Sequence, residues 1–160
     1  MPEDMKRRLV IPNDTKYLNT VRDFVVEVVG NSAFPKIDMG RIVLAVDEAV
    51  TNIIEHAYSN KREGEVDIQL ELQANATKFE AVIHDSGIHF DLEHINEPDM
   101  KDHVAKGRKN GLGIFLMRQI MDIVEYEFEE GVVNRLRLVK YVNPEDKDKD
   151  PDHKRPGSDE

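Results

Sequence analysis

Cysteine is absent from the 160 residues of this chain, so neither disulfides nor thiolate metal sites are available to it. No apolar run approaches the roughly 20 residues that a membrane-spanning helix needs. The N-terminus also lacks the apolar stretch of a signal peptide. We therefore predict a soluble protein that is located in the reducing cytoplasm and has no membrane partner.

Basic residues are too few for a typical nucleic-acid binder, since 22 Lys and Arg stand against 32 Asp and Glu, with a formal net charge of -10. Phosphate backbones would be repelled, so direct nucleic-acid binding is disfavoured and a basic protein partner is favoured. Charge of this sign also serves plain solubility, which is the simpler interpretation when composition is taken alone.

A chain of this length most often forms one domain, and its 39% hydrophobic residues are enough for a core. The last segment, 143–160, contains no apolar side chain other than its prolines and carries mixed charge. It cannot bury a core surface, so we expect a disordered charged tail. The predicted organisation is one folded domain over 1–142, followed by that tail.

Hydrophobic periodicity predicts a strand, two helices, a hairpin, a long loop, a third helix and a second hairpin. Strands are expected near 7–13, 65–74, 78–85, 125–130 and 133–142, and helices near 14–30, 37–58 and 112–124. Because strands come in neighbouring pairs, the predicted fold class is α+β, a two-layer sandwich with a mixed, mostly antiparallel sheet and helices on one face. The polar span 86–110 is expected to be a functional or disordered loop.

Three polar residues, Glu48, Asn52 and His56, recur at four-residue steps in the second predicted helix, within roughly 80° of one another. A carboxylate there can accept a proton or orient a nucleophile, and an amide oxygen suits Mg²⁺ held with phosphates. A polar stripe is nevertheless more often the solvated face of an amphipathic helix. His56, near the helix end, is expected to cap or pack.

Asp85 stands where the alternating strand 78–85 gives way to the loop, and Gly87 follows it in the motif DSGIHFD. A carboxylate at a strand end can accept a hydrogen bond from an exocyclic amine. A glycine nearby lets the backbone turn sharply or approach a ligand closely. The alternative is an ordinary Asp-Ser-Gly turn.

The stretch GRKNGLGIFLM, 107–117, places Gly111 and Gly113 at the start of the third predicted helix, just after Arg108 and Lys109. Backbone N–H groups at a helix start, together with the helix dipole, favour anions such as phosphate. The spacing is neither that of a P-loop nor that of a dinucleotide-binding turn. A flexible hinge before a buried helix is the alternative.

In this order, the three motifs strongly resemble those of the GHKL ATPase superfamily of gyrase-type, chaperone, histidine-kinase and mismatch-repair ATPases. DEAVTNIIEHAY, DSGIHFD and GLGIFLM are most similar to the motifs of bacterial anti-sigma-factor serine kinases of partner-switching systems. The resemblance covers about residues 7–142. Many members have a second glycine in the first glycine motif, where this chain has His89.

The resemblance implies the ATP-binding sandwich called the Bergerat fold, with ATP and Mg²⁺ as ligands. Glu48 matches the candidate general base, and Asn52 matches the residue that holds Mg²⁺ against the phosphates. Asp85 matches the carboxylate that reads adenine, and Gly87 the glycine beneath the base. The other implied nucleotide contacts are Lys109 in the lid, the phosphate-side glycines Gly111 and Gly113, and the adenine-facing Asn134.

The implied function is that of an anti-sigma factor that is also an ATP-dependent protein serine/threonine kinase. Its partners would be a sigma factor and an antagonist of the anti-sigma factor, and the antagonist would be phosphorylated on Ser or Thr. Relatives often pair as dimers, so a homodimer is a candidate assembly. A nucleotide-gated binding module of the same fold, without phosphotransfer, is the alternative; Glu48 speaks against it, because a pure binder needs only Asn52. An acidic interaction domain without nucleotide is a further class.

Overall fold

The computed structural model describes residues 5–57, 67–85, 110–129 and 133–149. Its strands are β1 (Met5–Pro12), β2 (Asp67–Ala74), β3 (Lys78–Asp85), β4 (Ile123–Glu129) and β5 (Val133–Tyr141). Its helices are α1 (Leu18–Val29), α2 (Lys36–Asn52) and α4 (Asn110–Ile120), with short helical turns at Thr15–Tyr17, Ile53–Ala57 and Pro144–Lys149. The described strands form one sheet, whose spatial order is β1-β2-β3-β5-β4.

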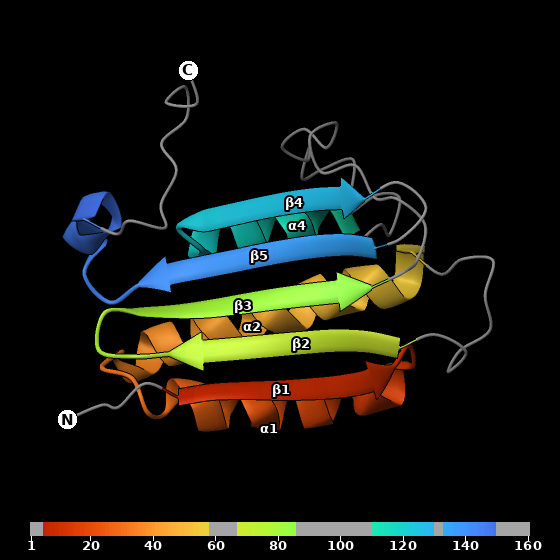
Figure 1. Cartoon of the computed structure of the whole chain (residues 1–160), viewed down its shortest axis with the longest axis horizontal. Helices are drawn as coiled ribbons and strands as arrows, with labels where there is room; N and C mark the ends of the chain where they lie inside the picture. The colour runs from red at the N-terminus through yellow and green to blue at the C-terminus, as the bar shows by residue number, and fades with distance from the viewer. Residues whose placement is uncertain (1–4, 58–66, 86–109, 130–132, 150–160) are drawn as a thin grey trace, which may run out of the picture.

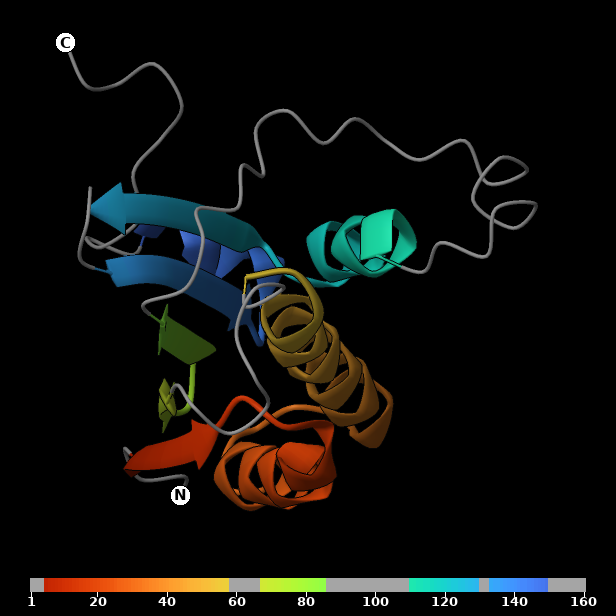
Figure 2. The same ribbon diagram turned by 90° about the vertical axis from the view of Figure 1, so that its right-hand side faces the viewer.

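All three helices lie on the same face of this sheet (Figures 1 and 2). The predicted α+β two-layer sandwich is therefore confirmed. Every neighbouring pair of described strands is antiparallel, so this part of the sheet is uniform where we expected a mixed one. Of the helices that the structure describes, none has the length and apolar character needed to cross a membrane.

The core fills the space between the sheet and the helices. The predicted alternation in β2 is confirmed, because its buried residues are Ile68, Leu70, Leu72 and Ala74. Their counterparts on α1 are Val21, Val25, Val28 and Val29, which recur at helical spacing. Burying an aliphatic side chain of this kind contributes about 1.5–3 kcal/mol, so these two rows stabilise the packing of α1 on the sheet.

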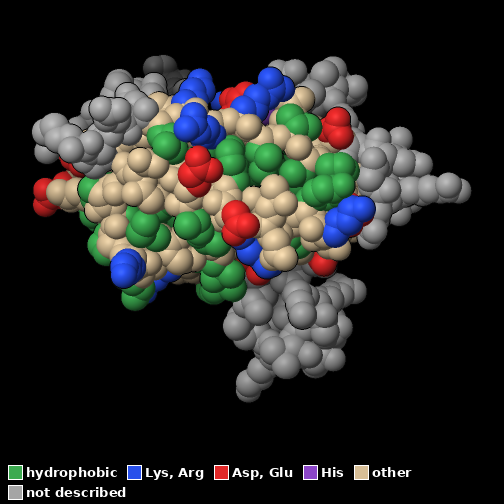
Figure 3. All heavy atoms as spheres, turned by 90° about the horizontal axis from the view of Figure 1, so that it is seen from below, with side chains coloured by type: hydrophobic (Ala, Val, Ile, Leu, Met, Phe, Trp, Pro, Cys, Tyr) green, Lys and Arg blue, Asp and Glu red, His purple; other side chains and the backbone are tan. Residues whose placement is uncertain are grey.

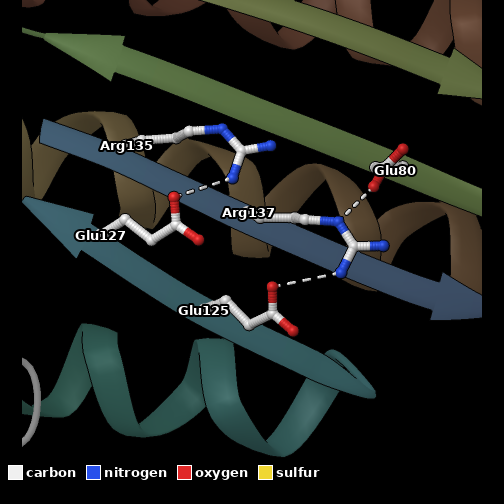
Figure 4. A network of polar contacts seen from close by, with 5 residues as sticks. All are labelled: Glu80, Glu125, Glu127, Arg135 and Arg137. Atoms are coloured by element: carbon white, nitrogen blue, oxygen red, sulfur yellow. Dashed lines mark hydrogen bonds and ion pairs between the residues drawn. The ribbon is translucent and has the colours of Figure 1, made fainter. Parts of the chain in front are cut away.

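The face of the sheet away from the helices, here called the open face, carries mainly charged and polar side chains. Glu80 on β3, Arg135 and Arg137 on β5, and Glu125 on β4 alternate there along and across the strands (Figure 4). Opposite charges on neighbouring strands attract at this spacing, which supports the register. Figure 3 views the edge formed by β1 and α1, where apolar and charged side chains are interspersed.

The third helix is shorter than predicted, because α4 ends at Ile120 and Ile123 already belongs to β4. Asp122 makes the break. Its carboxylate accepts a hydrogen bond from the Tyr141 backbone N–H at 2.7 Å, and its own N–H donates to the Val139 carbonyl at 2.8 Å. Pairing with β5 thus takes the backbone away from the helix, although the apolar pattern continues through both elements.

Two other predicted segments also differ from the structure. The second helix is regular only to Asn52, and the chain continues to Ala57 as a π-helical turn. The segment expected to be disordered begins with an ordered 3-10 helix, Pro144–Lys149, in which Lys147 Nζ donates to the Asp122 carbonyl at 3.2 Å. Residues 150–160 and most of the predicted loop, 86–109, lie outside the described residues.

Candidate functional site

Four separate elements have one of their ends on the same side of the sandwich, on the right in Figure 1 and facing the viewer in Figure 2. Helix α2 and strand β3 end at this edge, whereas α4 and β5 begin there. Asn52 is the last residue of α2, Asp85 the last of β3, and Asn134 the second of β5. The fold therefore brings together motifs that are far apart in the sequence.

Asp85 and Asn134 are directly opposite each other on β3 and β5, and both are buried. The Asn134 Nδ2 group donates to Asp85 Oδ1 at 2.9 Å, and the Tyr126 hydroxyl donates to Asn134 Oδ1 at 2.9 Å. A buried carboxylate is costly unless it accepts hydrogen bonds, so this chain of contacts stabilises Asp85 in its place. We did not identify Tyr126 from the sequence, since nothing in the alternation of β4 distinguishes it.

Asn52 is buried, and its Nδ2 group has no hydrogen-bond partner among the described residues. Such a group costs about 1–3 kcal/mol and calls for an explanation, of which a bound ligand is one. The π-helical turn that follows Asn52 is a feature often found at functional sites. An amide with an unused N–H donor and a hard oxygen fits a phosphate oxygen together with Mg²⁺.

The described residues contain no group of three or more His, Cys, Asp or Glu side chains placed to hold a metal ion. Mg²⁺ bound with nucleotide phosphates keeps most of its ligands as phosphate oxygen and water.

Glu48 is half-buried one turn before Asn52 on α2, and the residue beside it ties α2 to α1. Arg22 Nε lies 2.8 Å from Asp47 Oδ1, Arg22 Nη2 lies 3.3 Å from Asp47 Oδ2, and Arg22 Nη1 donates to Asn19 Oδ1 at 2.9 Å. The hydrogen bond and charge of Asp47, with a smaller contribution from the charge of Glu48, raise the pKa of Arg22. Sequence reasoning also missed this contact, because Arg22 and Asp47 belong to different helices.

Gly111 and Gly113 lie in the first turns of α4, whose start is at the same edge of the sheet. The first N–H groups of a helix have no partner within it, so they can bind an anion. Helix α4 packs against α2, which carries Glu48 and Asn52. The two remaining predicted contacts, Gly87 and Lys109, lie outside the described residues.

Comparison with known proteins gives a family match to the histidine kinase-like ATPase domain over residues 11–140. Serine-protein kinase RsbW of Oceanobacillus iheyensis is 31% identical over 146 residues, which cover 89% of this chain and 90% of that protein. The proteins of the same name in Listeria monocytogenes and Bacillus velezensis are 29% and 30% identical, covering 86% and 84% of this chain and 88% and 84% of their own lengths.

Proposed function

We propose that this chain, which belongs to the histidine kinase-like ATPase family, is an ATP-dependent protein serine/threonine kinase that also acts as an anti-sigma factor. The observation that carries the proposal is the meeting of α2, β3, β5 and the start of α4 at one edge, with a buried carboxylate and a buried, unpartnered amide. Similarity to serine-protein kinases over most of the chain supports the choice of reaction.

Asp85 would recognise the adenine base. Its carboxylate is buried at the end of β3 and accepts a hydrogen bond from Asn134 through one oxygen. A carboxylate can accept about four hydrogen bonds in all, so this contact uses a part of its capacity. The exocyclic amine of adenine is a suitable further donor. Gly87 would lie beneath the base.

Asn52 would hold the phosphate side of the nucleotide. Its Nδ2 group, unpartnered among the described residues, would donate to a phosphate oxygen, and its Oδ1 would be a ligand of Mg²⁺. When bound, Mg²⁺ would neutralise the charge that phosphoryl transfer moves between oxygens. The N–H groups near Gly111 and Gly113, with Lys109 just before them, would bind the remaining phosphate oxygens.

Glu48 would act as the general base. It would accept the proton of a Ser or Thr hydroxyl as that oxygen attacks the γ-phosphorus, while the bond to the bridging oxygen breaks and ADP leaves with the electron pair. Phosphoryl transfer depends mainly on positioning and charge neutralisation, so it needs few protein groups. Arg22, held by Asp47, keeps α1 attached to the helix that carries this base.

The protein substrate would be an antagonist of the anti-sigma factor, and the second partner a sigma factor, in the cytoplasm. Phosphate adds about two negative charges, which this acidic chain, with a net charge of -10, would repel. Phosphorylation would thus release the antagonist and leave the chain available for the sigma factor. A homodimer is part of the same proposal.

The test is transfer of labelled γ-phosphate to a cognate antagonist, with Glu48→Gln as the variant. General-base catalysis contributes about 10²–10⁴-fold, so we expect transfer to slow by that factor while ATP binding is retained. Glu55→Gln is the matched control, because Glu55 is exposed on the turn that follows α2. If Glu48→Gln binds ATP and transfers phosphate at the unaltered rate, Glu48 is not the base.

Nucleotide binding itself is tested by thermal unfolding with and without Mg²⁺-ADP, because a ligand of the native state raises its stability. No shift at millimolar nucleotide would overturn the proposed function. Stabilisation by nucleotide without transfer to any antagonist would instead support the nucleotide-gated binding module.

A further inference from the structure

The hydrogen bonds around Asp85 extend beyond the residue that would contact the nucleotide. They run across three neighbouring strands, from the Tyr126 hydroxyl on β4, through the Asn134 side chain on β5, to the carboxylate on β3. Both bonds are 2.9 Å long, and Asp85 and Asn134 are buried. Tyr126 itself packs against the hydrophobic core.

We infer that Tyr126 is a positioning residue for adenine recognition, acting through Asn134 on the Asp85 carboxylate. This inference rests on the proposed function, because it assumes that Asp85 accepts the exocyclic amine. Tyr126 would thus influence which purine base the site prefers without contacting the nucleotide itself.

The direction in which each group of this hydrogen-bond series donates follows from the group at its end, the Asp85 carboxylate. An ionised carboxylate only accepts hydrogen bonds, so Asn134 must turn its Nδ2 group toward Asp85. The amide oxygen of Asn134 then points the other way, and it needs a donor because it is buried. The Tyr126 hydroxyl supplies that donor. Each bond in such a chain polarises the next, so the Tyr126 contact also strengthens the hold of Asn134 on Asp85.

Strand pairing gives these hydrogen bonds a defined geometry. Asn134 is the registered partner of Asp85, and Tyr126 is the registered partner of Leu136, two residues along the same strand as Asn134. Side chains two residues apart on a strand share a face, so Tyr126 reaches Asn134 diagonally on the helix-facing side of the sheet. Groups held by paired strands keep their orientation better than groups on loops.

Loss of the Tyr126 hydroxyl should therefore affect recognition of the amine more than binding in general. Without the Tyr126 hydroxyl, the Asn134 side chain is held less firmly, so its Nδ2 group fixes the Asp85 carboxylate less precisely for the amine. Adenine carries this amine, whereas purine riboside lacks it. The ratio of the dissociation constants for these two triphosphates isolates the effect, because all phosphate contacts cancel.

The experiment measures by calorimetry the dissociation constants of ATP and purine riboside triphosphate for the full chain with Mg²⁺. In Tyr126→Phe we expect ATP to bind about 3- to 10-fold more weakly, as for one hydrogen bond, and the analogue nearly as before. The preference for ATP should fall by the same factor. Tyr141→Phe, which removes the hydroxyl of another tyrosine near the opposite end of the sheet, should leave the preference unaltered.

Asn134→Leu removes the side chain that links Tyr126 to Asp85, and it tests whether Tyr126 acts through Asn134. The preference for ATP should fall at least as far as in Tyr126→Phe, and the double variant should lose no more than Asn134→Leu alone. The inference would be overturned if the losses of ATP preference in Tyr126→Phe and Asn134→Leu add in the double variant. It would also be overturned if Tyr126→Phe lowers stability but leaves the ATP preference unaltered, because Tyr126 would then be merely structural. An unsubstituted chain that binds neither triphosphate would overturn the proposed function as well, so the two failures are distinguishable.

Discussion

Replacing Arg137 by methionine should lower the free energy of unfolding by about 2–3 kcal/mol, which is large for a residue on the open face of a sheet. Arg137 lies between Glu80 on β3 and Glu125 on β4 (Figure 4). Its Nε donates to Glu80, and its Nη1 donates to Glu125 Oε2 at 3.3 Å. Burial by itself would lower the pKa of Arg137, but the hydrogen bonds and charges of both glutamates raise it, so the guanidinium stays charged.

The magnitude follows from the exposure of the three side chains. Those of Arg137 and Glu80 are 9% and 20% exposed, and that of Glu125 is 35% exposed. Each hydrogen bond to a charged group is worth about 1.5–3 kcal/mol, so two of them set an upper limit of about 6 kcal/mol. Water can reach both glutamates once the arginine is gone, and this recovers about half of the loss.

Arg135→Met is the matched control, since Arg135 is on the same strand and the same face. Arg135 Nη1 lies 3.4 Å from Glu127 Oε2, and the two side chains are 36% and 61% exposed. An exposed pair of this kind contributes about 0–1 kcal/mol. We therefore expect Arg135→Met to cost at least about 1 kcal/mol less than Arg137→Met.

Equilibrium unfolding in urea measures both variants, with the slope m checked for constancy so that midpoints report stability. For a domain of this size, the Arg137 variant should melt about 4–12 °C lower, at 2–4 °C per kcal/mol. Two variants that differ by less than about 0.5 kcal/mol would refute the reasoning, because burial would then not set the strength of these ion pairs.

Three further predictions concern single side chains. Val25→Ala should lower the free energy of unfolding in urea by about 2 kcal/mol, whereas Val26→Ala should lower it by less than about 0.5 kcal/mol. The reason is that Val25 is 0% exposed and its neighbour on α1, Val26, is 54% exposed. Equal losses of stability would contradict the packing described for α1. Asp14→Ala should cost about 1 kcal/mol by the same measurement, because its carboxylate accepts from the Lys16 N–H at 3.0 Å before α1, and a cost of zero would mean that this cap is not formed. Asn52→Leu should leave the stability of the nucleotide-free protein unaltered or raise it by about 1 kcal/mol, because it removes a buried donor that has no partner among the described residues. The rise in melting temperature that Mg²⁺-ADP produces should disappear in this variant. Strong destabilisation without nucleotide would show that Nδ2 has a partner.

The hairpin β2–β3 was predictable because its strands alternate apolar and polar residues, and the register of its pairs places Ile68, Leu70 and Leu72 of β2 on the same face as Ala81 and Ile83 of β3. The end of α4 was not predictable in this way. Met117, Ile120, Met121 and Val124 recur at helical spacing across this boundary, so periodicity alone predicts that the helix continues to Val124. Strand pairing with β5, through Asp122, decides the matter.

The residues of the candidate site likewise include some that were predicted from the sequence and some that depend on contacts between strands. Glu48, Asn52 and Asp85 were predicted as site residues from short motifs whose order resembles that of a known family, although each motif alone also fits an ordinary helix face or turn. Tyr126 could not be identified, since its significance depends on Asn134, which lies on another strand.

The sequence by itself determined the α+β class, the hairpins, the helices and the three motifs, because those depend on periodicity and on residue types within short windows. Tertiary structure decided that α2, β3, β5 and α4 present their ends at one edge. It also decided that Arg22 ties α1 to α2 through Asp47, and that Arg137 is buried between two carboxylates. These contacts join residues that are distant in the chain, and only the folded backbone sets the distances between them.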